Sequence, residues 1–220
     1  LLRPIDRNEL RARVKTQVRR RRYQKRLRAH YEASVSMALT DPLTGLFNRR
    51  YLMAHLNKML HEANVGMKPL CVLLFDIDHF KNVNDTYGHG VGDDVIREFA
   101  NRMTKQLRSF DLLARLGGEE FVAVLPNIGR HTAFDVAYRM RKVIAEMPFN
   151  VPGKGQISVT CSIGGVILDD NMRDAEKAID RADKSLYEAK SSGRNCVYFE
   201  GLGLISQANV INPSVDDGFI

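Results

Sequence analysis

Apolar residues recur along this chain with two different periods, which separate expected helices from expected strands. Spacings of three and four residues predict four amphipathic helices, over 48–62, 93–107, 130–147 and 173–190. Short apolar runs predict five strands, over 70–77, 111–115, 120–125, 157–168 and 195–199. Asp93 is expected near the start of its helix, and residues 78–92 form a loop or a short helix. The order of these elements predicts a ferredoxin-like α/β sandwich with a hairpin at 111–125.

Upstream of this body, the stretch from Asp6 to Thr40 contains neither glycine nor proline. Leu27, Tyr31, Val35 and Leu39 recur at four-residue steps and predict one long helix, or two joined helices, that needs a partner helix. Asp41-Pro42 ends it. We therefore divide the chain into a connecting helix with the end of an upstream domain (1–40), a main domain (41–200) and a loose tail (201–220).

Charge is distributed unevenly. The chain carries 33 basic and 26 acidic residues, a net charge of +7, but residues 1–28 hold twelve bases and two acids. That segment is +10, which leaves −3 for the rest. We interpret the basic run as a solvated helix face and expect no nucleic-acid partner, although a nucleic-acid or membrane-surface patch is a minority alternative.

Other features of composition favour a cytoplasmic protein. The longest apolar run, 70–75, has six residues, too few to span a bilayer. The three cysteines lack CxxC spacing and read as free thiols in a reducing compartment, and the six histidines lack the spacing of a zinc site. The chain starts with Leu1, so we expect the natural N-terminus to lie further upstream.

Two clusters carry candidate chemistry. Asp76 is the first charge after the apolar strand 70–77, and a carboxylate there is costly unless it is paired or binds a metal. Gly117-Gly118-Glu119-Glu120 forms the expected hairpin tip, where glycines let a ligand approach the backbone. If the three carboxylates meet, they form an all-oxygen site of the kind that Mg²⁺ prefers beside phosphates. Two such ions could activate a hydroxyl and stabilise a leaving pyrophosphate.

Cations and amides elsewhere suit a nucleotide. Lys81, Lys190 and Arg194 could hold a triphosphate. Asn84 and Asp93 could read a base edge, and an Asp pairs with the two donors of guanine. Taken singly, each feature has a plainer interpretation as a polar turn, a helix cap or a solvated side chain. The residues together favour phosphate-and-metal chemistry, but they do not exclude these plainer interpretations.

At these residues the chain resembles the GGDEF family of diguanylate cyclases over about 40–200. The resemblance is carried by five short motifs in register, which are Asp41-Pro42-Leu43-Thr44-Gly45-Leu46-Phe47-Asn48-Arg49-Arg50, Asp76 to Lys81, Asn84-Asp85 with Gly88-His89 and Gly92-Asp93, Gly117 to Phe121, and Ala189-Lys190 with Gly193-Arg194-Asn195. It implies a palm like that of class III nucleotidyl cyclases, a mainly antiparallel sheet flanked by helices, and condensation of two GTP into cyclic di-GMP and two pyrophosphates.

The resemblance also implies roles for individual residues. Two Mg²⁺ or Mn²⁺ ions per active site would be held by Asp76, the carbonyl of Ile77, Glu119 and Glu120. Glu119, Glu120 and Lys81 would be catalytic, and the identity of the base is left open. The substrate-binding residues would be Asn84 and Asp93 for guanine, and His79, Phe80, Gly118, Lys81, Lys190 and Arg194 for the phosphates and the nucleotide. Each domain presents one GTP, so the resemblance implies a two-fold homodimer.

Two further features resemble regulatory parts of the family. Arg108 and Asp111 match its RxxD inhibitory site for cyclic di-GMP, with Arg139 as a helper, although both could simply end and cap a helix. Arg3-Pro4-Ile5 and the following helix resemble the end of a response-regulator receiver, which would bring two cyclase domains together. Alternatives left open are a non-catalytic GTP or cyclic di-GMP receptor, a cyclase for another nucleotide, and a nucleic-acid binder acting through the basic helix.

Overall fold

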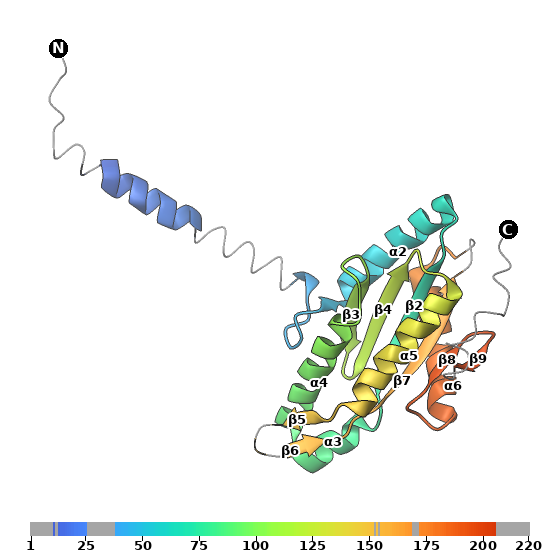
Figure 1. The fold of residues 1–220 in the computed structure, drawn as a ribbon. Helices are drawn as coiled ribbons and strands as arrows, with labels where there is room; N and C mark the ends of the chain where they lie inside the picture. Colours follow the sequence, from blue (N-terminus) through green and yellow to red (C-terminus); the bar gives the residue numbers. More distant parts are fainter. Residues whose placement is uncertain are drawn as a thin grey trace. The chain divides into compact units, whose positions relative to one another are not determined.

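The computed structural model describes residues 11, 13–25, 38–151, 153, 155–168 and 172–205 (Figure 1). The chain divides into two units, Leu1–Thr40 and Asp41–Ile220. In the first unit, residue 11 and residues 13–25 are helical with every side chain exposed, and residues 38–39 are helical too. These parts agree with the expected long helix, whereas its other residues and the receiver-like Arg3-Pro4-Ile5 lie outside the described residues.

One seven-stranded sheet forms the centre of the second unit, with the order β1-β3-β4-β2-β7-β8-β9. The strands are β1 (Phe47–Asn48), β3 (Leu112–Gly117), β4 (Glu120–Pro126), β2 (Leu70–Ile77), β7 (Cys161–Leu168), β8 (Val197–Phe199) and β9 (Gly203–Ile205). The central strand β2 is antiparallel to both of its neighbours, β4 and β7. The expected α/β fold with a mainly antiparallel sheet is therefore confirmed.

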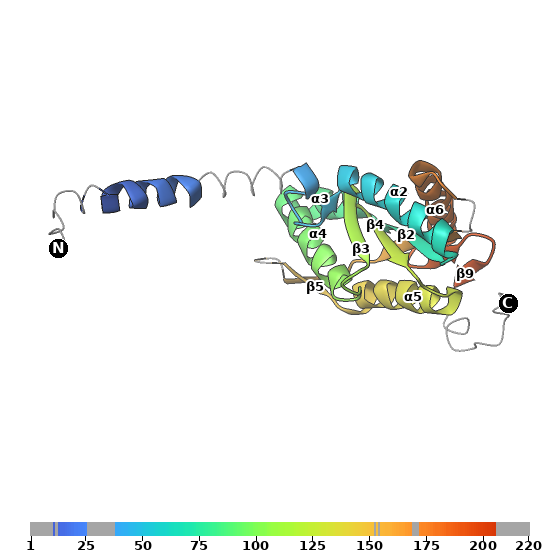
Figure 2. The same cartoon turned by 90° about the horizontal axis from the view of Figure 1, so that it is seen from above.

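Helices cover both faces of this sheet. Helix α2 (Arg49–Gly66) and helix α6 (Ala175–Ser191) pack on one face, and α4 (His89–Thr104) and α5 (Arg130–Glu146) pack on the other. Figure 2 shows α2 and α6 on the side opposite α5. Side chains alternate between the faces along a strand, so Leu70, Val72 and Leu74 of β2 join the α2/α6 core, and Cys71, Leu73 and Phe75 join the other.

The close contact between α6 and the sheet depends on a glycine. A Cβ atom on Gly164 of β7 would lie 2.2 Å from the backbone nitrogen of Leu186 and 2.3 Å from the carbonyl oxygen of Ala182. Its neighbour Gly165 lies against the ring of Phe199, whereas Gly164 is where α6 lies directly on β7. This contact fixes the position of the C-terminal half of α6, which carries Lys190.

The local boundaries differ from expectation in several places. Residues 78–92 contain the short helix α3 (Phe80–Tyr87), one of the two expected possibilities, but also the first residues of α4. Asp93 was expected near a helix start, but α4 begins at His89 after Gly88, so Asp93 lies one turn inside it. The segment 157–168 is two strands, because residues 158–160 separate β7 from β6 (Gly155–Ile157), which pairs with β5 (Phe149–Val151).

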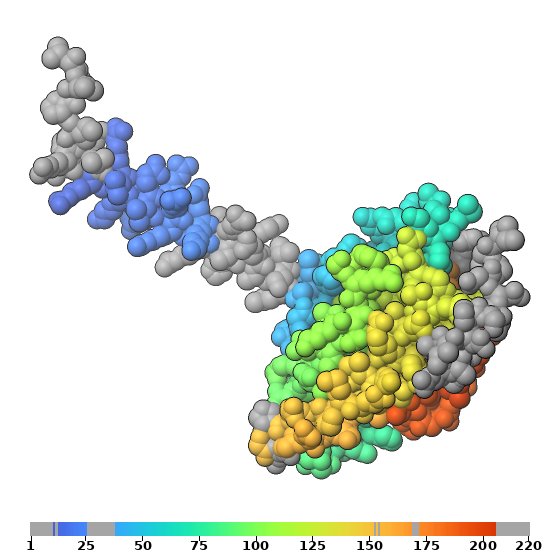
Figure 3. Space-filling view, in the orientation of Figure 1, coloured from blue at the N-terminus to red at the C-terminus, as the bar shows by residue number. Residues whose placement is uncertain are grey.

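Part of the expected loose tail is ordered. Residues 203–205 form β9 and pair antiparallel with β8, and Ile205 is buried. The expectation of an irregular tail from residue 201 is wrong for these residues, and residues 206–220 lie outside the described part. In the space-filling view the described surface of the second unit is continuous over the α4, α5 and β5 segments (Figure 3).

Candidate functional site

The end of β2 and the start of β4 bring two carboxylates together. Asp76 and Glu120 are direct partners in the antiparallel register, so their side chains project from the same face of the sheet. That face is the one covered by α2 and α6, because Glu120 lies on the same side of β4 as Val122 and Val124, which belong to the α2/α6 core. The third acidic residue, Glu119, directly precedes Glu120 in the chain. The backbone carbonyl oxygen of Glu119 accepts a 3.4 Å hydrogen bond from the backbone nitrogen of Ile77.

The tight turn before these glutamates needs its two glycines. Gly117 has φ of 149° and Gly118 has φ of 54°, and the latter lies in the left-handed region that costs little only for glycine. A Cβ atom at either position would meet no other atom within 4 Å, so the space beside the turn is open. The backbone of the turn is therefore accessible to a ligand.

A lysine from α6 neutralises part of this charge. Lys190 Nζ lies 2.8 Å from Asp76 Oδ2, with 10% of the Asp76 side chain exposed. Burial raises the pKa of Asp76, and the ion pair with Lys190 opposes this rise. The pKa of Glu120 is also raised, first by burial and then by the negative charge of Asp76. The part of the pKa shift of Glu120 that comes from Asp76 shows that the two carboxylates repel one another at this strand end.

Divalent ions would require further ligands here. Among the residues that the structure describes, no group of three or more His, Cys, Asp or Glu side chains is arranged to hold a metal ion. The nearby donors are nonetheless all oxygens, from Asp76, Glu120, Glu119 and the backbone at Ile77. Mg²⁺ commonly takes one or two carboxylates and completes its shell with water and substrate phosphates, so this donor set fits such an ion when a nucleotide is present.

Two helices beside this strand end carry the predicted base-reading residues. A Cβ atom on Gly92 of α4 would lie 2.0 Å from Asn84 Oδ1, so α3 and α4 pack closely only because residue 92 is glycine. Asn84 therefore lies against the residue that precedes Asp93. The α3 helix follows His79, which is in the left-handed conformation with φ of 56°. Lys81 is exposed on α3.

The loop after α6 carries the last predicted phosphate ligand. Gly193, Arg194 and Asn195 all have positive φ, of 110°, 65° and 46°. The carboxylate of Asp78 accepts a 3.0 Å hydrogen bond from the backbone nitrogen of Asn195. Arg141 Nη1 donates to Asn195 Oδ1 at 3.0 Å. The predicted residue Lys190 thus meets the end of β2 through Asp76, and the loop that carries Arg194 meets it through Asp78.

A second connection supports the diglycine turn from the other side. Arg115 of β3 donates from Nε and Nη2 to the carbonyl oxygen of Gly118, at 3.0 and 2.7 Å. Its Nη1 contacts both carboxylate oxygens of Asp41, at 3.0 and 3.1 Å. Burial would raise the pKa of Asp41, but hydrogen bonds from Thr44 and Arg115 outweigh it and hold the pKa below its ordinary value.

Sequence reasoning gave no role to Asp78 or Arg115. Their partners lie 117 and 74 residues away in the chain, so no local pattern reports the contacts. The one available signal for Asp78 is its spacing of two residues from Asp76, which suggests the same side of an extended segment.

Two residues of the predicted inhibitory site, Arg108 and Asp111, lie just before β3 at the opposite end of the sheet. The backbone nitrogen of Arg108 donates to Asp111 Oδ2 at 2.7 Å, and burial raises the pKa of Asp111. Arg139 donates to the side chain and the backbone carbonyl of Gln106, at 3.0 and 2.9 Å. Arg108 and the exposed Phe110 line a cavity of about 690 Å³ beside the start of β2. Asp111 therefore closes the turn between Arg108 and the start of β3, because its own backbone nitrogen also donates to the carbonyl oxygen of Arg108 at 3.1 Å.

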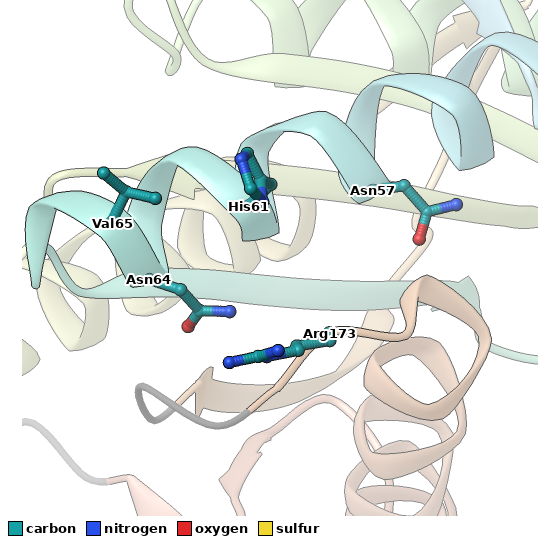
Figure 4. A pocket seen from close by; sticks show the side chains of 5 residues that line it. All are labelled: Asn57, His61, Asn64, Val65 and Arg173. Carbon is teal, nitrogen blue, oxygen red and sulfur yellow. The ribbon is translucent and has the colours of Figure 1, made fainter.

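A smaller cavity of about 460 Å³ lies between α2 and the start of α6 (Figure 4). Two of its lining amides hold the start of α6, because Asn57 Oδ1 accepts from the backbone nitrogen of Ala175 at 3.2 Å and Asn64 donates to the carbonyl of Met172 at 2.8 Å. None of the predicted site residues lines it. We assign this cavity to packing between the two helices.

Comparisons with known proteins agree on one family. The model of the diguanylate cyclase GGDEF domain matches residues 38–196. The response regulator PleD of Caulobacter vibrioides is 46% identical over 198 residues, which are 90% of this chain and 44% of PleD. The diguanylate cyclase DgcP of Pseudomonas aeruginosa is 40% identical over 171 residues, 78% of this chain and 25% of DgcP. The chain spans less than half the length of these relatives.

Solved structures lead to the same family. The coiled coil and GGDEF domain of DgcB from Caulobacter crescentus, in complex with c-di-GMP, matches with a TM-score of 0.77 and 30% identity over 86% of this chain and 98% of that one. The active GGEEF domain of a diguanylate cyclase from Vibrio cholerae has a TM-score of 0.64 and 34% identity, over 69% and 96% of the two chains. Within the described part of the chain, no helix has the length and apolar character needed to cross a membrane.

Proposed function

Because the chain belongs to the GGDEF family of diguanylate cyclase domains, we propose that it condenses two molecules of GTP into cyclic di-GMP and two pyrophosphates. The observation that carries this proposal is the register of β2 and β4, which pairs Asp76 with Glu120 beside the diglycine turn. Lys190 adds a cation at the same point, 2.8 Å from Asp76. Carboxylates and cations at one accessible strand end suit a triphosphate with its metal ions.

Asp76, Glu119, Glu120 and the carbonyl oxygen of Ile77 would hold two Mg²⁺ or Mn²⁺ ions in each active site. When bound, such ions lower the pKa of an attacking hydroxyl and neutralise charge on the phosphates. The carboxylates themselves supply the negative charge that attracts the ions. Glu119, at the turn, is a candidate for accepting the proton of the 3′-hydroxyl.

Nucleotide recognition is assigned to the elements around the strand end. Asp93 accepts hydrogen bonds from two donors on the guanine edge, and Asn84, which lies against Gly92, completes the reading of the base. The phosphates are held by Lys81, Lys190 and Arg194 and by the backbone at His79 and Phe80. Gly118 has no side chain, so the nucleotide can lie against the backbone of the turn.

Each domain offers one such site, so the reaction requires two chains facing one another, each with one GTP. The helical residues 13–25 are exposed on every side, which leaves them available to a partner helix or an upstream receiver. We therefore propose a homodimer as the active form, with a receiver in the longer protein as the device that assembles it.

We also propose that cyclic di-GMP inhibits the enzyme at Arg108, Asp111 and Arg139. The adjoining cavity of about 690 Å³ supports this, because it offers Arg108 and the exposed ring of Phe110 to a ligand. A guanidinium pairs with phosphate and stacks on a guanine base. Arg108→Ala should leave initial rates intact and relieve inhibition by added product, and unchanged inhibition would remove Arg108 from this site.

The test of the catalytic proposal is turnover of GTP by a sample shown to be dimeric by sedimentation. Incubation with GTP and Mg²⁺, followed by nucleotide chromatography, should yield cyclic di-GMP. Glu120→Gln should abolish the product without unfolding the chain, whereas Glu146→Gln, which removes an exposed carboxylate of α5, should not. No product from a dimeric wild type that still binds GTP would instead identify a nucleotide receptor.

A further inference from the structure

Asp78 is a buried carboxylate for which the proposed chemistry has no use. Asp78 is the first residue after β2, and it is only 5% exposed. Oδ1 accepts from Ser162 Oγ at 2.6 Å, and Oδ2 accepts from Thr160 Oγ1 at 2.7 Å. Its backbone nitrogen donates to the carbonyl of Thr160 at 2.9 Å. These bonds fasten the end of β2 to the start of β7 and leave the carboxylate in one orientation.

The third bond of this carboxylate reaches the loop that carries Arg194. Asp78 Oδ2 accepts from the backbone nitrogen of Asn195 at 3.0 Å. Arg194 and Asn195 are consecutive non-glycine residues in the left-handed conformation, which is unfavourable without surrounding constraints. The backbone nitrogen of Arg194 donates to the carbonyl of Ala189 at 3.2 Å, and Arg141 holds Asn195 from the other side. Asp78 is thus one of the constraints that hold this backbone.

We propose that Asp78 is a positioning residue, which fixes the 193–195 loop so that Arg194 meets the GTP phosphates. This inference rests on the proposed function, because it assumes that Arg194 binds phosphate. A carboxylate suits the task because it only accepts hydrogen bonds, and each of the three groups that face it donates one. In Asp78→Asn an NH₂ group replaces one of the acceptors, so either the N–H of Asn195 loses its partner or the Ser162 hydroxyl must change from donor to acceptor. Asp78 therefore acts on the substrate through Arg194 and does not touch it.

A double-mutant cycle tests this coupling. Asp78→Asn, Arg194→Ala and the double variant are compared with wild type for binding of a non-hydrolysable GTP analogue and of GMP. Asp78→Asn should weaken binding of the analogue about tenfold and of GMP less than about twofold, because only the analogue places three phosphates at the loop. In the Arg194→Ala background the same change should weaken the analogue by less than about twofold. Asp180→Asn, at an exposed carboxylate of α6, is the matched control.

Several outcomes would decide the matter. Equal losses for the analogue and GMP, or additive losses in the cycle, would show that Asp78 only stabilises the fold and would overturn the inference. If Asp78→Asn does not fold in a thermal melt, Ser162→Ala, which removes one donor from the carboxylate, is put through the same cycle and judged in the same way. Failure of the proposed function looks different, because then wild type makes no product and Arg194→Ala leaves binding of the analogue unchanged.

Discussion

Arg102 provides a quantitative test of what joins α4 to α5. The side chain lies on α4 with 8% of its surface exposed, and Nε donates to Glu98 Oε1 at 2.8 Å. Its Nη2 donates to the carbonyl of Pro148 at 2.8 Å, and Nη1 donates to the carbonyl of Met147. The guanidinium carbon lies 3.9 Å from the centre of the Phe149 ring. One cation therefore satisfies the backbone carbonyls of the two residues that follow the end of α5.

The expected cost of removing this cation follows from these contacts. A hydrogen bond to a charged group contributes about 1.5–3 kcal/mol, and an unsatisfied buried carbonyl costs about 1–3 kcal/mol. Contributions from one side chain are not additive, and loss of one partner from a buried charged cluster costs about 3–5 kcal/mol. We therefore expect Arg102→Ala to lower the free energy of unfolding by about 3–4 kcal/mol, a large share of the stability of an ordinary domain.

Urea unfolding followed by circular dichroism measures this difference. Arg97→Ala is the matched control on the same helix, because Arg97 pairs with Asp94 at 2.7 Å while 51% of its side chain is exposed. Exposed pairs contribute at most about 1 kcal/mol, so the control should unfold near the wild-type midpoint. A loss below about 1 kcal/mol for Arg102→Ala would refute the view that this cation is the main link between the two helices.

Three shorter predictions concern the site and its frame. Lys190→Met should increase the affinity for Mn²⁺ in the absence of nucleotide about threefold to thirtyfold, because Asp76 loses its competing cation. Electron paramagnetic resonance measures this affinity, and an unchanged or weaker value would contradict the prediction. Arg115→Met should lower kcat about tenfold and speed amide exchange in the diglycine turn, with a loss of stability of about 3–5 kcal/mol because the half-buried Asp41 loses its cation, and slow exchange in the turn would contradict it. Gly164→Ala should destabilise the fold by at least about 1–3 kcal/mol, whereas Gly90→Ala, which adds a Cβ in open space, should not.

The sequence predicts the long elements because their periodicity records burial. Helices α2, α4, α5 and α6 and strands β2, β3, β4, β7 and β8 all overlap the expected segments. The shortest strands carry no such record. Strand β1 has two residues, and its strand character comes from pairing Phe47 with Ala114 and Asn48 with Arg115. A stretch of two residues cannot display a period, so only its partner identifies it.

The same limit applies to the start of α4. An Asp before an apolar-periodic run resembles an N-cap, and that pattern predicted a helix start at Asp93. In the structure the helix begins four residues earlier, after Gly88, because α3 and α4 meet in a tight packing that Gly92 permits. A tertiary contact therefore overrides the local capping signal. The correction matters for the site, since Asp93 now lies within a rigid helix and next to the residue that packs against Asn84.

The two carboxylates of the site meet because of the register between β2 and β4, which the sequence of either strand alone does not reveal. Asp76 meets Glu120 because β2 and β4 pair residue for residue from Leu70 with Pro126 onward. A shift of one residue would turn one of the two carboxylates to the opposite face. The buried partners Leu74 and Val122, in the core under α2 and α6, oppose such a shift. Packing at the middle of the sheet thus determines the geometry at its end.

Two aspartates separated by one residue differ in what their surroundings leave free. Asp78 lies beyond the strand, where hydroxyls of Thr160 and Ser162 and a backbone N–H occupy its oxygens. A carboxylate satisfied by neutral donors inside the protein gains little from a metal ion. Asp76 is instead paired, among the described residues, with Lys190, whose side chain is 34% exposed, and it lies opposite another carboxylate. A metal ion or substrate phosphate that displaced Lys190 would therefore find an excess of negative charge there. The hydrogen bonds of the two aspartates, rather than the sequence motif, separate the one available for chemistry from the one that holds the loop.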